Sequence, residues 1–287
     1  MTDVGTGTGT GTVLPAGPEP ELRPGRSPGP GHPARRFALL RHSLTLAWRA
    51  LLKLRRTPEQ LLDVTFQPII FVVLFVYLFG GAIAGSQQAY LQFVLPALMV
   101  QTLMFSSLTI GVNLNTDIKK GVFDRFRSLP IGRSAPLIGA VLGELLRFTI
   151  STTVIMGFGA ILGFRVRTGP VQALAGCLLA IGFALALCWV AVLVGLLVRE
   201  PGGVQGFGFL VMFPLTFGSS MFVPPSTLPD WLAGWVAVNP VTHLVDAVRA
   251  LMIGGPTAWP VTAALLWAIG IVAVFAPLAV TVYRRKT

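Results

Sequence analysis

Charged side chains are scarce in this chain. They make up 11% of its 287 residues, whereas hydrophobic residues make up 53%, and the mean hydropathy is +0.74. Soluble domains carry roughly 25% charged residues, so this composition indicates an integral membrane protein. The net charge is +11, but the basic residues border apolar runs and form no basic face with interleaved aromatics. Nucleic acid is therefore not an expected partner.

Residues that carry chemistry are also few. The two cysteines, Cys177 and Cys188, lie in one apolar run, about 16 Å apart on a helix, which is too far for a disulfide. One histidine, His243, has an acidic neighbour in Asp246, but a single His–Asp pair does not make a metal site. No GxxxxGK[ST] motif occurs, so the chain has no P-loop for ATP. We expect neither an enzyme nor a bound cofactor or metal.

Long uncharged runs dominate the rest of the sequence. Six apolar segments are long enough to span the roughly 30 Å of hydrocarbon in a bilayer: 64–84, 89–114, 137–163, 171–198, 204–223 and 261–283. Five of them contain no formal charge, and the third contains Glu144 and Arg147. A charge at the bilayer centre is costly, so this exclusion predicts an all-α protein with six transmembrane helices. Glu144 and Arg147, three residues apart, form a possible intramembrane ion pair.

The amino-terminal region differs from the rest. Residues 1–34 are rich in Gly, Pro and Thr, which predicts a disordered tail. Residues 35–57 place apolar and basic side chains on opposite faces of a helix, typical of an amphipathic helix in the membrane interface. A cytosolic helix packed on protein is the alternative. Residues 35–287 then form one transmembrane domain.

The distribution of Lys and Arg predicts the orientation. With both termini inside, nineteen basic residues fall on the cytoplasmic side and three, Arg165, Arg167 and Arg249, fall outside. This asymmetry follows the positive-inside rule.

The stretch TDIKKGVFDRFRSLPIGR, 116–133, concentrates seven charges between two apolar runs. On a helix Phe123, Phe126 and Leu129 share one face, Asp124 faces away, and Pro130 ends the helix. An anchor that only orients the chain needs Lys and Arg alone, so the aromatic face favours a docking helix. A simple positive-inside anchor remains the alternative.

The segment 223–260 holds two short helical patterns divided at Asn239–Pro240. Asn239 suits an N-cap, Pro240 suits the first helical position, and Gly254–Gly255 suits a stop. Each pattern is too short to span a bilayer, so we expect re-entrant or surface-lying helices between the last two spans. A plain external hairpin is the alternative.

Two segments carry a family resemblance: DIKKGVFDRFRSLPIGRSAP in the charged stretch and NPVTHLVDAVRALMIGG near the end. With the basic entry helix and six spans, they make residues 36–285 resemble type-2 ABC exporter permeases, in particular the daunorubicin/doxorubicin-resistance permeases. The resemblance implies two permease copies paired with two separate ATPase subunits that bind ATP–Mg. It also implies that the charged stretch is the coupling helix, with these matching positions: Gly121, Phe123, Asp124, Arg125, Phe126, Arg127, Leu129 and Pro130.

From this resemblance we expect a permease subunit in the bacterial cell membrane that exports hydrophobic or amphiphilic compounds such as antibiotics. Its partners would be the ATPase, a second permease copy and membrane lipids. The expected substrate path uses apolar residues of spans one, two and five: Phe71, Phe75, Met104, Phe105, Phe213 and Phe217. The alternatives are a permease for a lipid-linked glycan or polysaccharide, and a membrane scaffold or sensor that transports nothing.

Overall fold

The computed structural model describes residues 58–120, 135–223 and 227–286. Within these ranges every regular element is a helix, and they run in the order α2 (Pro58–Ala84), α3 (Gln87–Lys119), α5 (Ala135–Ile161), α6 (Pro170–Leu197), α7 (Pro201–Phe217), α8 (Asp230–Val238), α9 (Pro240–Ile253) and α10 (Ala258–Lys286). The predicted tail 1–34, the interfacial helix 35–57 and the proposed coupling residues 121–130 lie outside the described residues. The prediction of an all-helical membrane protein is confirmed for the rest.

Within the described ranges, five helical segments are long and apolar enough to cross a membrane: Phe66–Ala84, Gln87–Lys119, Gly143–Ile161, Pro170–Leu197 and Ala258–Tyr283. They correspond to the first four predicted spans and the last one. The number of candidate spans rises to six only if α8 and α9, which are bent by 76° at their junction, are counted together as one span. The sequence therefore predicted the multi-pass architecture correctly, while the count of six spans stays a prediction.

The predicted fifth span differs most from the structure. It was expected at 204–223, but α7 has 17 residues and ends at Phe217, which gives a length of about 25 Å. The reason is a contact from the distant junction of α8 and α9: the Asn239 amide donates hydrogen bonds to the carbonyls of Leu215 (2.8 Å) and Gly218 (2.7 Å). These bonds satisfy the end of α7, and the chain turns away.

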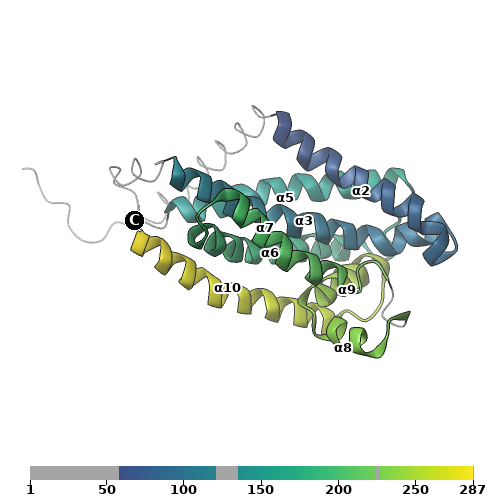
Figure 1. The fold of residues 1–287 in the computed structure, drawn as a ribbon. Coiled ribbons are helices and arrows are strands. Elements are labelled where there is room, and N and C mark those ends of the chain that lie inside the picture. Colours follow the sequence, from purple (N-terminus) through teal and green to yellow (C-terminus); the bar gives the residue numbers. More distant parts are fainter. Residues whose placement is uncertain (1–57, 121–134, 224–226, 287) are drawn as a thin grey trace, which may run out of the picture.

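Helix α3 forms the centre of the bundle (Figure 1), and it packs against α2, α5, α6, α7 and α9. Most of its apolar surface is buried by protein, whereas α2 and α10 leave most of theirs exposed. Exposed apolar surface of this extent fits contact with lipid chains. Because lipid is as apolar as the helices, close side-chain packing rather than the hydrophobic effect holds such a bundle together.

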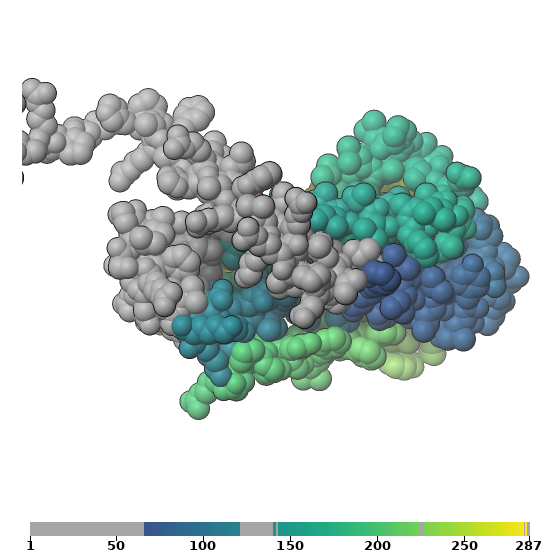
Figure 2. Space-filling model, turned by 90° about the horizontal axis from the view of Figure 1, so that it is seen from above, coloured from purple at the N-terminus to yellow at the C-terminus, as the bar shows by residue number. Residues whose placement is uncertain are grey.

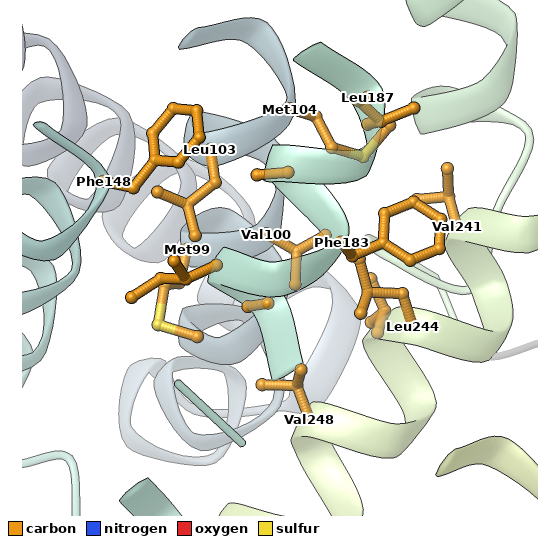
Figure 3. Packing of buried hydrophobic residues seen from close by; sticks show 14 of the residues in the cluster. Met99, Val100, Leu103, Met104, Phe148, Phe183, Leu187, Val241, Leu244 and Val248 are labelled. Carbon is orange, nitrogen blue, oxygen red and sulfur yellow. The ribbon is translucent and has the colours of Figure 1, made fainter. Parts of the chain in front are cut away.

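One buried hydrophobic cluster joins α3 to α5, α6 and α9. Met99 and Leu103 lie close to Phe148 of α5, while Phe183 of α6 meets Leu244 of α9 (Figure 3). All five side chains are buried. A buried cluster shared by four helices makes their relative positions interdependent.

Helices α8 and α9 lie at the end of the bundle opposite the carboxyl terminus (Figure 1). The predicted break between them is confirmed: the Asn239 side chain accepts a hydrogen bond from the Val241 amide at 2.9 Å, and Pro240 is the first residue of α9. The predicted stop is confirmed as well, since Gly254 caps α9 with a φ of 99°, which suits glycine.

Arg249 joins this hairpin to the bundle. Its guanidinium lies 3.0 Å from Asp246, donates to the Phe93 carbonyl of α3 at 3.1 Å, and lies 3.9 Å from the centre of the Phe93 ring. It also donates to the carbonyls of Ser220 (3.2 Å) and Met221 (3.4 Å), just after α7. One side chain therefore connects α9, α3 and the turn that follows α7.

Candidate functional site: a cavity between α2, α3 and α7

A cavity of about 460 Å³ lies where α2 and α7 both pack on α3. Among the described residues, α2 and α7 make no helix–helix contact with each other, so α3 forms the floor and the other two form the walls. Figure 2 shows α7 in green as a separate ridge beside the blue and teal residues of α2 and α3. The volume is in the range of small-molecule binding sites, roughly 300–1,000 Å³.

The floor of the cavity is one face of α3. It presents Gln101, Thr102, Phe105, Ser106, Leu108, Thr109 and Val112. The spacing of three and four residues follows from 3.6 residues per helical turn, which stacks such side chains on one side. This face mixes amide and hydroxyl groups with apolar groups, so α3 gives the cavity an amphiphilic floor.

The walls are mainly aromatic. From α2 come Gln67 and Phe71, and from α7 come Gln205, Phe209, Phe213 and Phe217. The four α7 residues recur every fourth position, which places them on one helix face. Phe209 contacts Phe105 of the floor, with ring centres 5.2 Å apart. The cavity thus offers flat apolar surfaces on both sides.

Ring contacts also close one end of the cavity. Phe222, in the turn after α7, stacks on Phe75 of α2 at 4.7 Å and on Phe217 of α7 at 5.1 Å. Phe75 in turn stacks on Phe71 at 6.1 Å, and Phe217 on Phe213 at 4.3 Å. These stacked rings link the two walls at the end nearest the turn after α7, with distances in the usual range for aromatic pairs.

The structure brings together four of the six residues expected on the substrate path: Phe71, Phe105, Phe213 and Phe217 line the cavity. Phe75 lies directly behind Phe71 and contacts Phe222. Met104 does not line the cavity. It is buried in the core, on the side of α3 where Leu187 of α6 lies (Figure 3).

Several residues that line the cavity were not predicted from the sequence. Phe209 could have been found from its spacing of four residues before Phe213. Gln67, Gln101 and Gln205 carried no signal, because a glutamine in an apolar run is compatible with any helix face.

The predicted pair of Glu144 and Arg147 lies behind the cavity rather than in it. Arg147 Nε is 3.2 Å from Glu144 Oε2, and both side chains are largely buried. The Arg147 guanidinium also donates to the backbone carbonyl of Ser106 on α3 at 2.5 Å. Through this hydrogen bond the pair connects α5 to α3, the helix that forms the cavity floor.

The carboxyl-terminal end of α3 is attached to the end of α6 and to Glu200, the residue before α7. Lys119 forms an ion pair with Glu200 at 2.5 Å, and the Asn115 amide donates to the carbonyls of Gly195 (2.9 Å) and Val198 (2.7 Å). The expected coupling residues follow within a few positions along the chain. The end of α3 that leads into them is therefore held against the turn between α6 and α7, which precedes the helix that forms one wall of the cavity.

Among the side chains that the structure describes, none that lines the cavity is ionisable. Across the described ranges, no group of three or more His, Cys, Asp or Glu is placed to hold a metal ion. The chemistry available in the cavity is thus apolar contact with rings and uncharged hydrogen bonding through amides and hydroxyls.

A bundle of long apolar helices with lipid-like exposed surface defines a multi-pass helical membrane protein. The family model described as ABC-2 type transporter matches residues 41–253. The chain belongs to the ABC-2 type transporter family, and within it to the permeases.

Two kinds of relative illustrate this. The chain is 41% identical to the daunorubicin resistance ABC transporter permease protein DrrB1 of Streptomyces coeruleorubidus, over 85% of this chain and 86% of that protein. It is 28% identical to a probable doxorubicin resistance ABC transporter permease protein, DrrC, of Mycobacterium tuberculosis, over 94% and 97%. More distantly, it is 28% identical to a putative transport permease of Cyanophora paradoxa, over 75% of each chain. The resemblance found in the sequence is confirmed.

Proposed function

We propose that this chain is the transmembrane subunit of an ATP-driven exporter that moves hydrophobic or amphiphilic compounds, including antibiotics, out of the cell. The cavity between α2, α3 and α7 carries the proposal. Its stacked rings suit an apolar body and its amides suit a few polar substituents. The drug-resistance names of the similar permeases agree with such a substrate.

ATP would be hydrolysed on a separate subunit. In this proposal residues 121–130 form the coupling helix that docks on that ATPase, and two permeases assemble with two ATPases. The contacts of Asn115 with the end of α6 and of Lys119 with Glu200, the residue before α7, support this arrangement, because they connect the end of α3 next to the docking segment with the turn that leads into a cavity wall. ATP binding on the partner would then change the spacing of the walls and expose the cavity to alternate sides.

The membrane placement follows from the charges. We place both termini and residues 121–130 on the cytoplasmic side of a bacterial cell membrane, and α8 and α9 at the outer mouth. The basic residues favour this orientation. The aromatic side chains of Trp231, Trp235 and Trp259, all largely exposed around α8 and the start of α10, are typical of a membrane–water boundary.

The function is tested with the full complex. The permease and the ATPase encoded beside it are produced together in a drug-sensitive host, and efflux of a fluorescent amphiphilic drug is followed in energised cells. ATP-dependent efflux that is lost when the ATPase carries a P-loop lysine substitution supports the proposal. An ATPase stimulated by lipid-linked sugars but not by drugs would identify a glycan permease instead, and a chain that associates with no ATPase would identify a scaffold or sensor.

A further inference from the structure

Two exposed arginines, Arg165 and Arg167, lie in the turn between α5 and α6. In the proposed orientation they are outside the cell, where basic residues are disfavoured. Neither side chain forms an ion pair with a carboxylate that the structure describes, and Glu144, Glu200 and Asp246 each pair with another cation. Two cations this close along the chain repel each other, so a ligand that neutralises both is favoured.

The backbone that carries the two arginines is fixed by the rest of the bundle. The Gly163 carbonyl accepts hydrogen bonds from the side-chain amides of Gln88 (2.7 Å) and Gln92 (3.2 Å), both on α3. The Arg167 amide donates to the Met252 carbonyl at the end of α9 at 3.0 Å. A segment that is already ordered loses little entropy when a ligand binds, so the arginines are held ready for an anion.

Exposed apolar side chains adjoin the arginines on both sides along the chain. Ile161, the last residue of α5, is 81% exposed, and Val171 and Leu174 at the start of α6 are 77% and 60% exposed. Both helices contain segments long and apolar enough to cross a membrane, so this surface fits contact with lipid chains. Arginine at the end of such a helix extends to the level of the lipid headgroups, and its guanidinium can bind a phosphate through two parallel hydrogen bonds.

We propose that Arg165 and Arg167 bind the headgroup phosphate of an anionic phospholipid, whose acyl chains lie against the exposed apolar side chains of α5 and α6. A zwitterionic lipid binds less well, because its ammonium group is repelled by the same two arginines. One basic residue close to an anionic lipid surface corresponds to about fivefold in affinity, so the pair corresponds to about five- to thirtyfold. The inference rests on the proposed function only for the leaflet, which is the outer one in the orientation proposed above.

The test measures which lipid lies beside this turn. Full-length permease is placed in phosphatidylcholine nanodiscs that contain a small fraction of either phosphatidylglycerol or phosphatidylcholine with a photoactivatable diazirine in the acyl chain. After irradiation the protein is digested with chymotrypsin, and mass spectrometry quantifies the lipid crosslinked to residues 158–178. Crosslinks to α10 in the same sample provide the internal reference.

The variant is Arg165→Gln with Arg167→Gln. The matched control is Arg199→Gln with Arg285→Gln, which removes two exposed arginines from the opposite end of the bundle and lowers the net charge equally. For native protein and for the control, we expect crosslinking at 158–178 to favour phosphatidylglycerol about five- to thirtyfold. In the Arg165/Arg167 variant this preference disappears, while crosslinking of phosphatidylcholine is unchanged. Glycerol 3-phosphate, which has the headgroup chemistry without acyl chains, should not compete at millimolar concentration.

Four results would overturn the inference. Native protein without a preference for phosphatidylglycerol at 158–178 would show that no anionic lipid is selected there. A preference that survives in the Arg165/Arg167 variant would remove these two residues from the site, and an equal loss in both variants would show that only net charge matters. Effective competition by glycerol 3-phosphate would identify a site for a soluble phosphate anion instead. Since none of these measurements depends on export, each of these results leaves the proposed exporter function standing.

Discussion

Gly111 of α3 and Gly195 of α6 lie in direct backbone contact. A Cβ atom on Gly195 would collide with the carbonyl of Gly111, and one on Gly111 would collide with the carbonyl of Ala191, again on α6. The contact requires glycine on both helices and brings their axes close together, as small residues do in membrane bundles. Because Asn115 bonds to α6 one turn further on, this crossing positions the end of α3 that leads to the proposed coupling segment.

Gly195→Ala should lower the free energy of unfolding by about 1–3 kcal/mol, because the colliding atoms belong to the backbone and cannot rotate away. The measurement is the thermal unfolding of purified permease in nanodiscs. Gly182→Ala, in the same helix, is the control, since a Cβ there meets no atom within 4 Å. Equal stability of the two variants would contradict the close crossing.

Arg249→Met should destabilise the protein by about 3–5 kcal/mol, because it removes the charged partner of Asp246 and a donor to each of three backbone carbonyls. Arg249→Lys should recover only part of the loss, since an ammonium group cannot reach all of these acceptors. Arg165→Gln, which changes an exposed arginine, should have little effect. A native-like unfolding temperature for Arg249→Met would show that the hairpin is held by other contacts.

Phe213→Ala should weaken substrate binding and export about two- to tenfold, because it removes one ring from the cavity wall. Phe207→Ala is a matched control on the same helix, since Phe207 is similarly exposed but does not line the cavity. Drug efflux from cells at equal expression levels provides the comparison. If both substitutions reduce efflux to the same degree, the loss reflects α7 in general rather than the cavity.

The double substitution Arg125→Glu with Arg127→Glu should reduce association with the ATPase at least about tenfold and abolish export, because reversed charges would face the docking surface. Co-purification of the ATPase with tagged permease measures this association. The matched control is Arg165→Glu with Arg167→Glu, an identical change of charge in the turn after α5. Unimpaired association of the first variant would remove the coupling role from this segment.

The predicted orientation can be tested with single added cysteines. A membrane-impermeant maleimide should label Thr257→Cys in intact cells and Thr287→Cys only after permeabilisation, because the first lies near the outer mouth and the second at the cytoplasmic terminus in our placement. The native chain, which has only Cys177 and Cys188, provides the background. Labelling of Thr287→Cys in intact cells would reverse the topology.

Local signals explain what could be read from the sequence. Uninterrupted apolar runs predicted the long helices, since a bilayer excludes charge whatever the rest of the fold does. The break before α9 was predictable because Asn239 and Pro240 act on backbone groups of adjacent residues. The pairing of Glu144 with Arg147 likewise depends only on a spacing of three residues.

The length of α7 and the composition of the cavity depended on tertiary contacts. Helix α7 ends early because Asn239, more than twenty residues later, bonds its last carbonyls. Met104 and Phe105 are neighbours in an apolar run, yet one lies in the core and the other in the cavity. Since polar residues occur both on the cavity face of α3, as at Thr102, and on its buried face, as at Ser107, its sequence carries no amphipathic pattern that distinguishes these faces.

The sequence by itself thus determined that this chain is a multi-pass helical membrane protein, because hydropathy and local capping act over one helix at a time, and the resemblance of two of its segments pointed to a permease. Only the tertiary structure decided which face of α3 meets α2 and α7, and therefore that Gln101 joins the phenylalanines around one cavity. That choice follows from packing among several helices, such as the glycine contact of α3 with α6. Such packing exists only when helices that are distant in the sequence come together.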